Sequence, residues 1–395
     1  MSQLFRQSSG LRTRPVEETL GYARRLGREV GIARVTDTTR LDRIGVPVFA
    51  SIRPQAHPAS LHVSAGKGQT PAEAEVGAWM EGIELAFAEP ERARPPVVRA
   101  RAGDVIGEFC LRDDAVGVDP RVPLGAIEAV DLGSGEAALV PAELVLFPAP
   151  LALIGASLFT ADGNGLASGN SVDEATVHGL AEVIERDVMA FHFARDTSQG
   201  VPVSTLPRPL ADLAERLDRT GFDLVIRHER NAFGLPWFKA VLSERNAVNA
   251  IHPGFGCSPI REIALSRAIT EAIQARLTVI HGGRDDLRPV LRHAAGARAD
   301  LAQGEIDRAH AGTDAVGYEE TPDWSHVAVD VSSAKELLLE RLRVAGFPRA
   351  LRVVYTPPEL PLHVVRVLVP GLAIKAGPLD RGGPRLRAHA RGKGA

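Results

Sequence analysis

The chain has 395 residues, of which 45% are hydrophobic and 24% are charged, and its formal net charge is −3. This composition is typical of a globular protein with one large or two medium domains, and it argues against a nucleic-acid protein with a broad basic surface. Only two cysteines occur, so no disulfide framework is indicated and we expect a cytoplasmic protein.

The first ten residues, MSQLFRQSSG, lack the apolar core of a secretory signal. A helix is expected near residues 73–88, where apolar residues recur at helical spacing and Glu73, Glu81 and Glu84 follow one edge of the apolar stripe. The loop before it, SAGKG, places Lys67 at a helix N-terminus, where free N–H groups favour an anion. Thr70 could equally be a plain helix cap.

The uncharged segment 144–161, LVLFPAPLALIGASLFTA, could be mistaken for a membrane span. Pro148 and Pro150 lie in its first half, and a proline costs a helix interior about 3 kcal/mol. We therefore expect a strand, a turn and a second strand, buried in a core, and no association with a membrane.

A second helix is expected near residues 174–193, and its sequence repeats the first. SGNSVDEATVHGLAEVIERD, residues 168–187, aligns without a gap with KGQTPAEAEVGAWMEGIELA, residues 67–86. Such self-similarity indicates which residues occupy equivalent places. Three acidic positions recur on the same helix edge: Glu73 and Glu174, Glu81 and Glu182, Glu84 and Glu185.

The second helix also follows a small polar loop, which contains Ser168 and Asn170. Asp173 could cap this helix. His178 stands where the first copy has Gly77, and we interpret it as a neighbour of the acidic edge rather than a metal ligand.

A fainter third copy predicts a helix near residues 262–278, in GCSPIREIALSRAITEAIQARL. Glu271 falls under Glu182 and Gln274 under Glu185 in this alignment. Cys257 lies opposite Ser168, and we expect a small buried residue there rather than a thiol nucleophile.

The acidic helix edges have two explanations. Carboxylates at the margin of a buried face need partners, because an unpaired charge there is strongly destabilising. Arg186 or Arg267 could supply ion pairs at helical spacing, or a divalent cation such as Mg²⁺ could be bound together with a phosphate. No Walker sequence, GxGxxG, HExxH or GxSxG motif is present, so zinc and nucleophile-elbow chemistries are disfavoured.

The basic end of the chain, RLRAHARGKGA, is expected to be a solvated tail. We therefore divide the chain into an N-terminal segment, residues 1–60, a core, residues 61–372, and a C-terminal tail, residues 373–395.

The repeat, together with RVTDTTRLDRIGVPVFASIRP (residues 34–54), SAGKG, ALSRAITEAIQ and VVRVLVPGL, resembles the YcaO superfamily over residues 12–372. The ExxER motif in a long helix, preceded by the GN loop, is the most specific part of this resemblance. It implies an α+β composite domain with internally repeated strand and helix units and a non-Walker ATP site between helices.

The resemblance also implies a set of binding residues, with ATP and Mg²⁺ as cofactors and the catalytic residue left unknown. The implied Mg²⁺ ligands are Glu81, Glu84, Glu182 and Glu185. The implied ATP-contacting residues are Arg12, Thr19, Lys67, Ser168, Asn170, Glu174, Arg186 and Arg267. One departure is Leu85, since the first helix reads ExxEL rather than ExxER.

The implied activity is ATP-dependent activation of a backbone amide in a ribosomally made peptide or protein. Sulfide as nucleophile would give a thioamide, and a Cys, Ser or Thr side chain of the substrate would give an azoline. The chain lacks the PxPxP end common in azoline-forming members, and we expect no fused leader-binding domain before Arg12. TRLDRIGVPVFASIRP is similar to members that act beside a TfuA-type partner, which favours the thioamide. The resemblance is also compatible with a homodimer. A non-catalytic ATP-binding protein and a scaffold with salt-bridged helices remain alternative functions.

Overall fold

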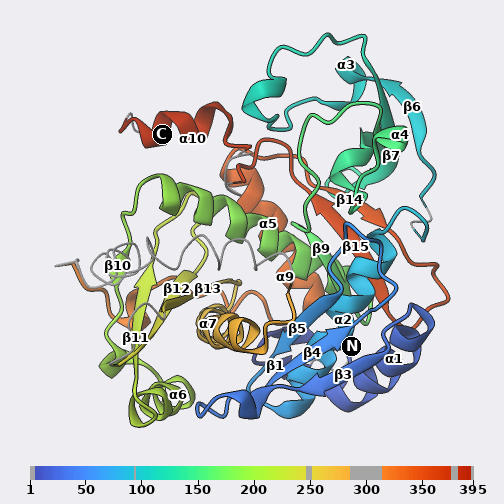
Figure 1. Ribbon diagram of the computed structural model, residues 1–395. Helices are drawn as coiled ribbons and strands as arrows, with labels where there is room; N and C mark the ends of the chain where they lie inside the picture. The colour runs from blue at the N-terminus through green and yellow to red at the C-terminus, as the bar shows by residue number, and fades with distance from the viewer. Residues whose placement is uncertain (1–4, 93–94, 246–250, 285–313, 375–380, 393–395) are drawn as a thin grey trace, which may run out of the picture.

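The structure is a computed structural model that describes residues 5–92, 95–245, 251–284, 314–374 and 381–392 (Figure 1). Within these residues the strands form four antiparallel sheets. One is the hairpin of β1 (Phe5–Gln7) and β2 (Gly10–Arg12), and a second has the order β3 (Arg34–Asp37), β4 (Val48–Ile52), β5 (Val63–Lys67).

The remaining strands form two larger sheets. The six-stranded sheet has the order β6 (Val98–Arg101), β7 (Pro123–Asp131), β14 (Leu351–Val354), β15 (His363–Leu368), β9 (Leu166–Gly169), with β8 (Ala137–Pro141) also paired to β7. The four-stranded sheet has the order β10 (Gln199–Gly200), β11 (Phe222–His228), β12 (Trp237–Glu244), β13 (Ile251–Cys257).

The helices differ widely in length. Three are long, namely α2 (Pro71–Ala88), α5 (Val172–Ala194) and α7 (Arg261–His281). The others are α1 (Val16–Glu29), α3 (Ala102–Val105), α4 (Leu151–Ile154), α6 (Arg208–Arg219), α9 (Val331–Val344) and α10 (Gly383–Ala390). None of the described helices has the length and apolar character that crossing a membrane requires.

Three strand–helix units repeat along the chain: β5–α2, β9–α5 and β13–α7. In each unit, an edge strand leads through a short loop into a long helix that packs back onto the same sheet. Figure 1 shows the three helices converging near the centre of the molecule, with α7 between the four-stranded sheet and β5. The predicted α+β class with repeated strand and helix units is confirmed, whereas the boundaries at residues 60 and 372 stay predictions.

The matched apolar positions of the repeat anchor three separate parts of the core. Ile83, Ile184 and Ile273 are each 0% exposed, and each belongs to a different hydrophobic cluster. Burying such a side chain stabilises the fold by about 1.5–3 kcal/mol. The apolar stripe seen in the sequence therefore fixes the rotation of each helix, and with it the direction in which the acidic edge faces.

The predicted strand–turn–strand in residues 144–161 is wrong. This segment begins with the end of a 3₁₀ turn (Ala142–Leu144) and contains a cis Phe147–Pro148 bond and the single-turn helix α4. The buried carboxylate of Glu143 accepts hydrogen bonds from the amides of Leu158 and Phe159, at 2.7 and 3.0 Å. A side chain thus satisfies backbone groups that a strand partner would otherwise bind.

The prediction of a solvated C-terminal tail is also wrong for residues 381–392, while residues 375–380 and 393–395 lie outside the described part of the chain. Helix α10 packs beside α5, where Arg385 forms an ion pair with buried Asp187 and lies over the ring of Phe191. Arg381 and Arg387 also have acidic partners, Asp162 and Asp113, so much of this segment is held against the fold.

Close packing of β13 on α7 yields a stability prediction. A Cβ atom added to Gly256 would lie 2.0 Å from the carbonyl oxygen of Ala264, whereas one added to Gly21 in α1 would meet nothing within 4 Å. We expect Gly256→Ala to lower the free energy of unfolding by roughly 1–3 kcal/mol or more, and Gly21→Ala to leave it unchanged or raise it by up to about 1 kcal/mol. Urea unfolding of both variants checks this, and equal midpoints would contradict it.

Candidate functional site

A cavity of about 640 Å³ lies between the three repeated units and the N-terminal hairpin. This volume is within the usual range of ligand pockets. Its lining includes ten of the twelve predicted site residues: Arg12, Thr19, Lys67, Glu81, Glu84, Ser168, Glu174, Glu182, Arg186 and Arg267. The repeat therefore brings together residues that lie more than two hundred positions apart in the sequence.

Carboxylates from all three repeated helices face this cavity. Glu81, Glu182 and Glu271 occupy equivalent places in α2, α5 and α7, and Glu84 lies one turn after Glu81. They are partly accessible to the cavity, yet the surrounding protein desolvates them. This burial raises the pKa of Glu182 to about 7, and it raises the pKa values of Glu81 and Glu84 above their ordinary range.

Ion pairs account for only part of this acidic cluster. Lys67 Nζ lies 2.5 Å from Glu271 Oε2, and the combined attraction of Lys67 and Arg186 outweighs burial and holds the pKa of Glu271 below its ordinary value. Glu84 accepts a hydrogen bond from the Ser168 hydroxyl at 2.5 Å, but among the described residues neither Glu81 nor Glu84 has a cation within ion-pair distance. Salt bridges alone therefore do not explain the helix edges.

Two arginines supply unsatisfied donors at the same cavity. The Nε atoms of Arg186 and Arg267 are buried and have no hydrogen-bond partner in the described structure. Burial acts to lower the pKa of Arg186, but the carboxylates of Glu185 and Glu182 outweigh it and hold this pKa above its ordinary value. Arg186 also lies 4.0 Å from the carboxylates of Glu182 and Glu185, so only its Nε group and that of Arg267 lack an acceptor among the described residues. Carboxylates without a close cation beside unsatisfied guanidinium N–H groups are the donor set that a metal ion with a phosphate group would complete.

Two predicted residues do not line the cavity. Glu185 is 1% exposed, and its Oε2 accepts a hydrogen bond from the Cys257 amide at 2.9 Å. Asn170 links Thr19 to Glu174. Its Oδ1 accepts a hydrogen bond from the Thr19 hydroxyl at 2.8 Å, and its Nδ2 donates one to Glu174 at 3.0 Å. In this structure both residues hold other parts of the site in place.

The small residues near the site have structural roles. Thr70 caps α2, while α5 is capped by Ser171 rather than Asp173, which pairs with Lys335 at 2.8 Å. Cys257 is 1% exposed, and burial raises the pKa of its thiol well above the ordinary value, as expected for an unreactive cysteine.

Glu271 and His178 are two of the cavity residues outside the predicted set. Glu271 was signalled by the third repeat copy, which places it under Glu182. His178 lines the cavity and a small second chamber beside it. Burial, Arg267 and Arg12 hold its pKa well below the ordinary value, so the imidazole is neutral at pH 7.

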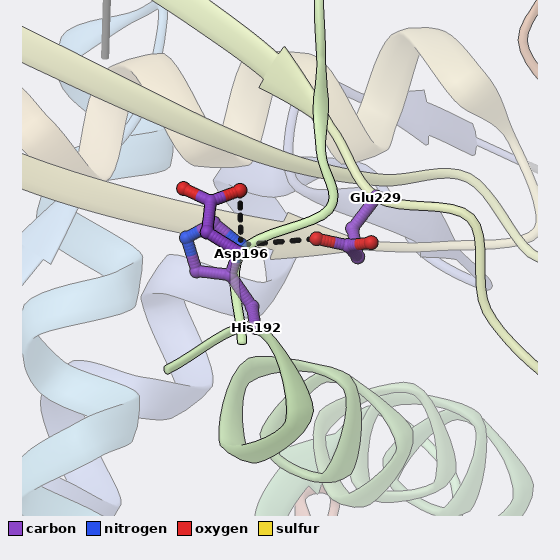
Figure 2. A group of neighbouring side chains, drawn as sticks. All are labelled: His192, Asp196 and Glu229. Carbon is purple, nitrogen blue, oxygen red and sulfur yellow. Dashed lines mark hydrogen bonds and ion pairs between the residues drawn. The ribbon is translucent and has the colours of Figure 1, made fainter. Parts of the chain in front are cut away.

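A separate cluster of His192, Asp196 and Glu229 has donor atoms within 4.8 Å of one another, as Figure 2 shows. His192 Nδ1 lies 3.1 Å from Glu229 Oε2, and its Nε2 lies 3.3 Å from the ammonium group of Lys239. Since both ring nitrogens already have protein neighbours, we interpret the cluster as a buried polar network that ties α5 to the four-stranded sheet.

Comparisons with known proteins agree with this geometry. A family model described as YcaO cyclodehydratase, ATP- and Mg²⁺-binding, matches residues 65–373. An uncharacterized protein of Methanothermobacter thermautotrophicus is 32% identical over 385 residues, which are 95% of this chain and 98% of that protein. An uncharacterized protein in the tfuA 3′ region of Rhizobium leguminosarum bv. trifolii is 29% identical over 368 residues, which are 88% of this chain and 85% of that protein.

A solved structure is similar over nearly the same length. YcaO from Methanopyrus kandleri, bound with AMPPCP and Mg²⁺, has a TM-score of 0.77 and 27% sequence identity, covering 94% of this chain and 95% of that chain.

The pKa of Glu182 predicts a link between stability, pH and Mg²⁺. Because its folded-state pKa of about 7 exceeds the ordinary 4.5, protonated Glu182 favours the fold at low pH, and this stabilisation is lost as the pH rises from 4.5 through 7. Glu182→Gln should therefore stabilise the metal-free protein at pH 8, by up to about 3 kcal/mol. Mg²⁺ should stabilise the wild type at this pH more than the variant.

Thermal unfolding at pH 5 and pH 8, with and without Mg²⁺, checks this prediction. Glu75→Gln is a matched control, because Glu75 also lies on α2 but does not line the cavity and pairs with Arg24 of α1 at 2.7 Å. A Glu182→Gln variant that is less stable than the wild type at pH 8 without Mg²⁺ would contradict the expected direction.

Proposed function

Because this chain belongs to the YcaO family of ATP- and Mg²⁺-binding proteins, we propose that it activates a backbone amide of a peptide or protein substrate, giving a thioamide together with a TfuA-type partner. The observation that carries the proposal is that, in one cavity, the carboxylates of Glu81 and Glu84 have no cation within ion-pair distance among the described residues, while the Nε groups of Arg186 and Arg267 have no acceptor. Such a site is suited to a metal ion and the phosphate groups of a nucleotide.

In this proposal the twelve predicted residues divide into Mg²⁺ ligands and nucleotide contacts. Glu81, Glu84 and Glu182 hold Mg²⁺, and Glu185 is the fourth predicted ligand, with Oε1 as the oxygen that the Cys257 amide does not use. Lys67, Arg186 and Arg267 face the phosphates, where guanidinium groups bind oxygens through several N–H donors. Arg12, Thr19, Ser168, Asn170 and Glu174 complete the predicted nucleotide contacts.

Bound ATP would supply the phosphoryl group that leaves with the amide oxygen as phosphate, and bound Mg²⁺ would supply positive charge beside it. In the thioamide reaction, a sulfide-class donor forms the carbon–sulfur bond as the carbon–oxygen bond breaks, without net oxidation or reduction. The role of the chain itself is to fix the positions of the reactants.

Two observations favour a thioamide. The relative from the tfuA 3′ region is similar over most of the chain, and TRLDRIGVPVFASIRP is similar to TfuA-associated members. The alternative product is an azoline, formed by attack of a Cys, Ser or Thr side chain of the substrate, and the description of the matching family as a cyclodehydratase favours it. A salt-bridged scaffold is disfavoured because Glu81 and Glu84 lack cationic partners among the described residues.

The product can be identified without knowing the substrate in advance. We would replace the protein in its source cells with Glu182→Gln or with the control Glu75→Gln, and then compare peptide masses across the proteome. We expect a peptide in which sulfur replaces one amide oxygen, present in wild-type and Glu75→Gln cells and absent in Glu182→Gln cells. A peptide that has instead lost water would indicate an azoline, and identical peptide masses in all three strains would contradict amide activation.

A further inference from the structure

The N-terminal strap, residues 5–13, borders the cavity. Its strands β1 and β2 pair with each other, with Phe5 opposite Arg12 and Gln7 opposite Gly10, and with no other described strand. Gln7, Ser9 and Arg12 line the cavity. The strap is therefore part of the site, yet no sheet hydrogen bonding fixes it to the rest of the fold.

Equivalent glutamates of the repeat hold the strap at two points. Glu73 in α2 accepts hydrogen bonds from the Ser8 amide at 3.0 Å and the Ser8 hydroxyl at 2.5 Å. Glu174, its counterpart in α5, accepts from the Thr13 amide at 2.9 Å and the Thr13 hydroxyl at 2.8 Å. A glutamate thus binds a backbone amide and a hydroxyl of the strap twice: from α2 at the turn of the hairpin, and from α5 just after β2.

The third repeated helix also contacts the strap. Arg6 pairs with Glu262 in the first turn of α7 at 2.6 Å, and Arg267 Nη1 lies 3.5 Å from the Ser9 carbonyl oxygen. All three repeated helices therefore hold the strap through side chains. Hydrogen bonds to a charged carboxylate are the strongest of these contacts.

The position of the strap determines where Arg12 lies. Its guanidinium projects into the cavity and contacts buried Glu174 at 3.3 Å. Glu174 contacts this arginine directly, whereas no hydrogen bond or ion pair joins Glu73 to Arg12, and Glu73 binds the hairpin at Ser8.

We propose that Glu73 is a positioning residue for the nucleotide site, which latches the N-terminal strap across the cavity so that Arg12 faces the bound phosphates. The strap opens at this latch to admit the nucleotide and closes over it afterwards. The identity of the ligand rests on the proposed function, whereas the latch itself depends only on the contacts between Glu73 and Ser8.

The test combines nucleotide affinity with exposure of the strap. Mg²⁺–AMPPCP is titrated calorimetrically into wild type, Glu73→Gln, Ser8→Ala and the control Glu75→Gln. Release of the strap by trypsin, which cleaves after Arg6 and Arg12, is followed by mass spectrometry with and without Mg²⁺–AMPPCP. We expect Glu73→Gln and Ser8→Ala to weaken binding about 10-fold and to release the strap faster, while Glu75→Gln behaves like wild type and the nucleotide slows release.

A double variant tests whether Glu73 acts through Arg12. If it does, Glu73→Gln combined with Arg12→Ala binds Mg²⁺–AMPPCP no more weakly than Arg12→Ala alone, whereas additive losses would overturn the proposed role. Unchanged affinity and strap release in both Glu73→Gln and Ser8→Ala would also overturn it. A wild type that does not bind Mg²⁺–AMPPCP would contradict the proposed function, and the trypsin comparison would still show whether the latch exists.

Discussion

Several carboxylates share one desolvated cavity, and among the described residues Glu81 and Glu84 have no cation within ion-pair distance, which is the electrostatic constraint at the centre of the molecule. Ionised carboxylates in such a place destabilise the fold unless something compensates them, and the raised pKa values of Glu81, Glu84 and Glu182 express that cost. A chain that served only as a scaffold would gain stability by replacing them. A divalent cation bound at these carboxylates would compensate their charge.

The fold creates this constraint by using one unit three times. Each unit has an edge strand, a short loop and a long helix whose apolar stripe is anchored by a fully buried isoleucine. The anchoring directs equivalent glutamates into a common cavity, so the acidic cluster follows from the repeat itself. The same equivalence gives the first turns of α2 and α5 matching glutamates, which hold the N-terminal strap beside that cavity.

Much of the site could be predicted because its signals are local. Helical spacing and the internal alignment located the long helices, and eight of the ten predicted residues that line the cavity lie on these helices or shortly before them. The other two, Arg12 and Thr19, come from β2 and α1 and were predicted from the resemblance alone. The direction of Glu185 was not evident, since it depends on the amide of Cys257 in a distant strand. The strap contacts were hidden for the same reason, because Ser8 and Glu73 are adjacent only in three dimensions. The backbone of residues 158–160 was mispredicted because a side chain, Glu143, replaces a strand partner there.

We propose that α2 and α5 together supply one magnesium-dependent nucleotide site. The most direct test is calorimetric titration of ATP into the wild type and into Glu84→Gln, each with Mg²⁺ and with a chelator. Glu84 is the informative position because it belongs to α2, yet it is hydrogen-bonded to Ser168 just before α5. We predict binding by the wild type only when Mg²⁺ is present, and a loss of that binding in Glu84→Gln. Binding that is equally strong with the chelator, or unchanged in Glu84→Gln, would contradict the composite site.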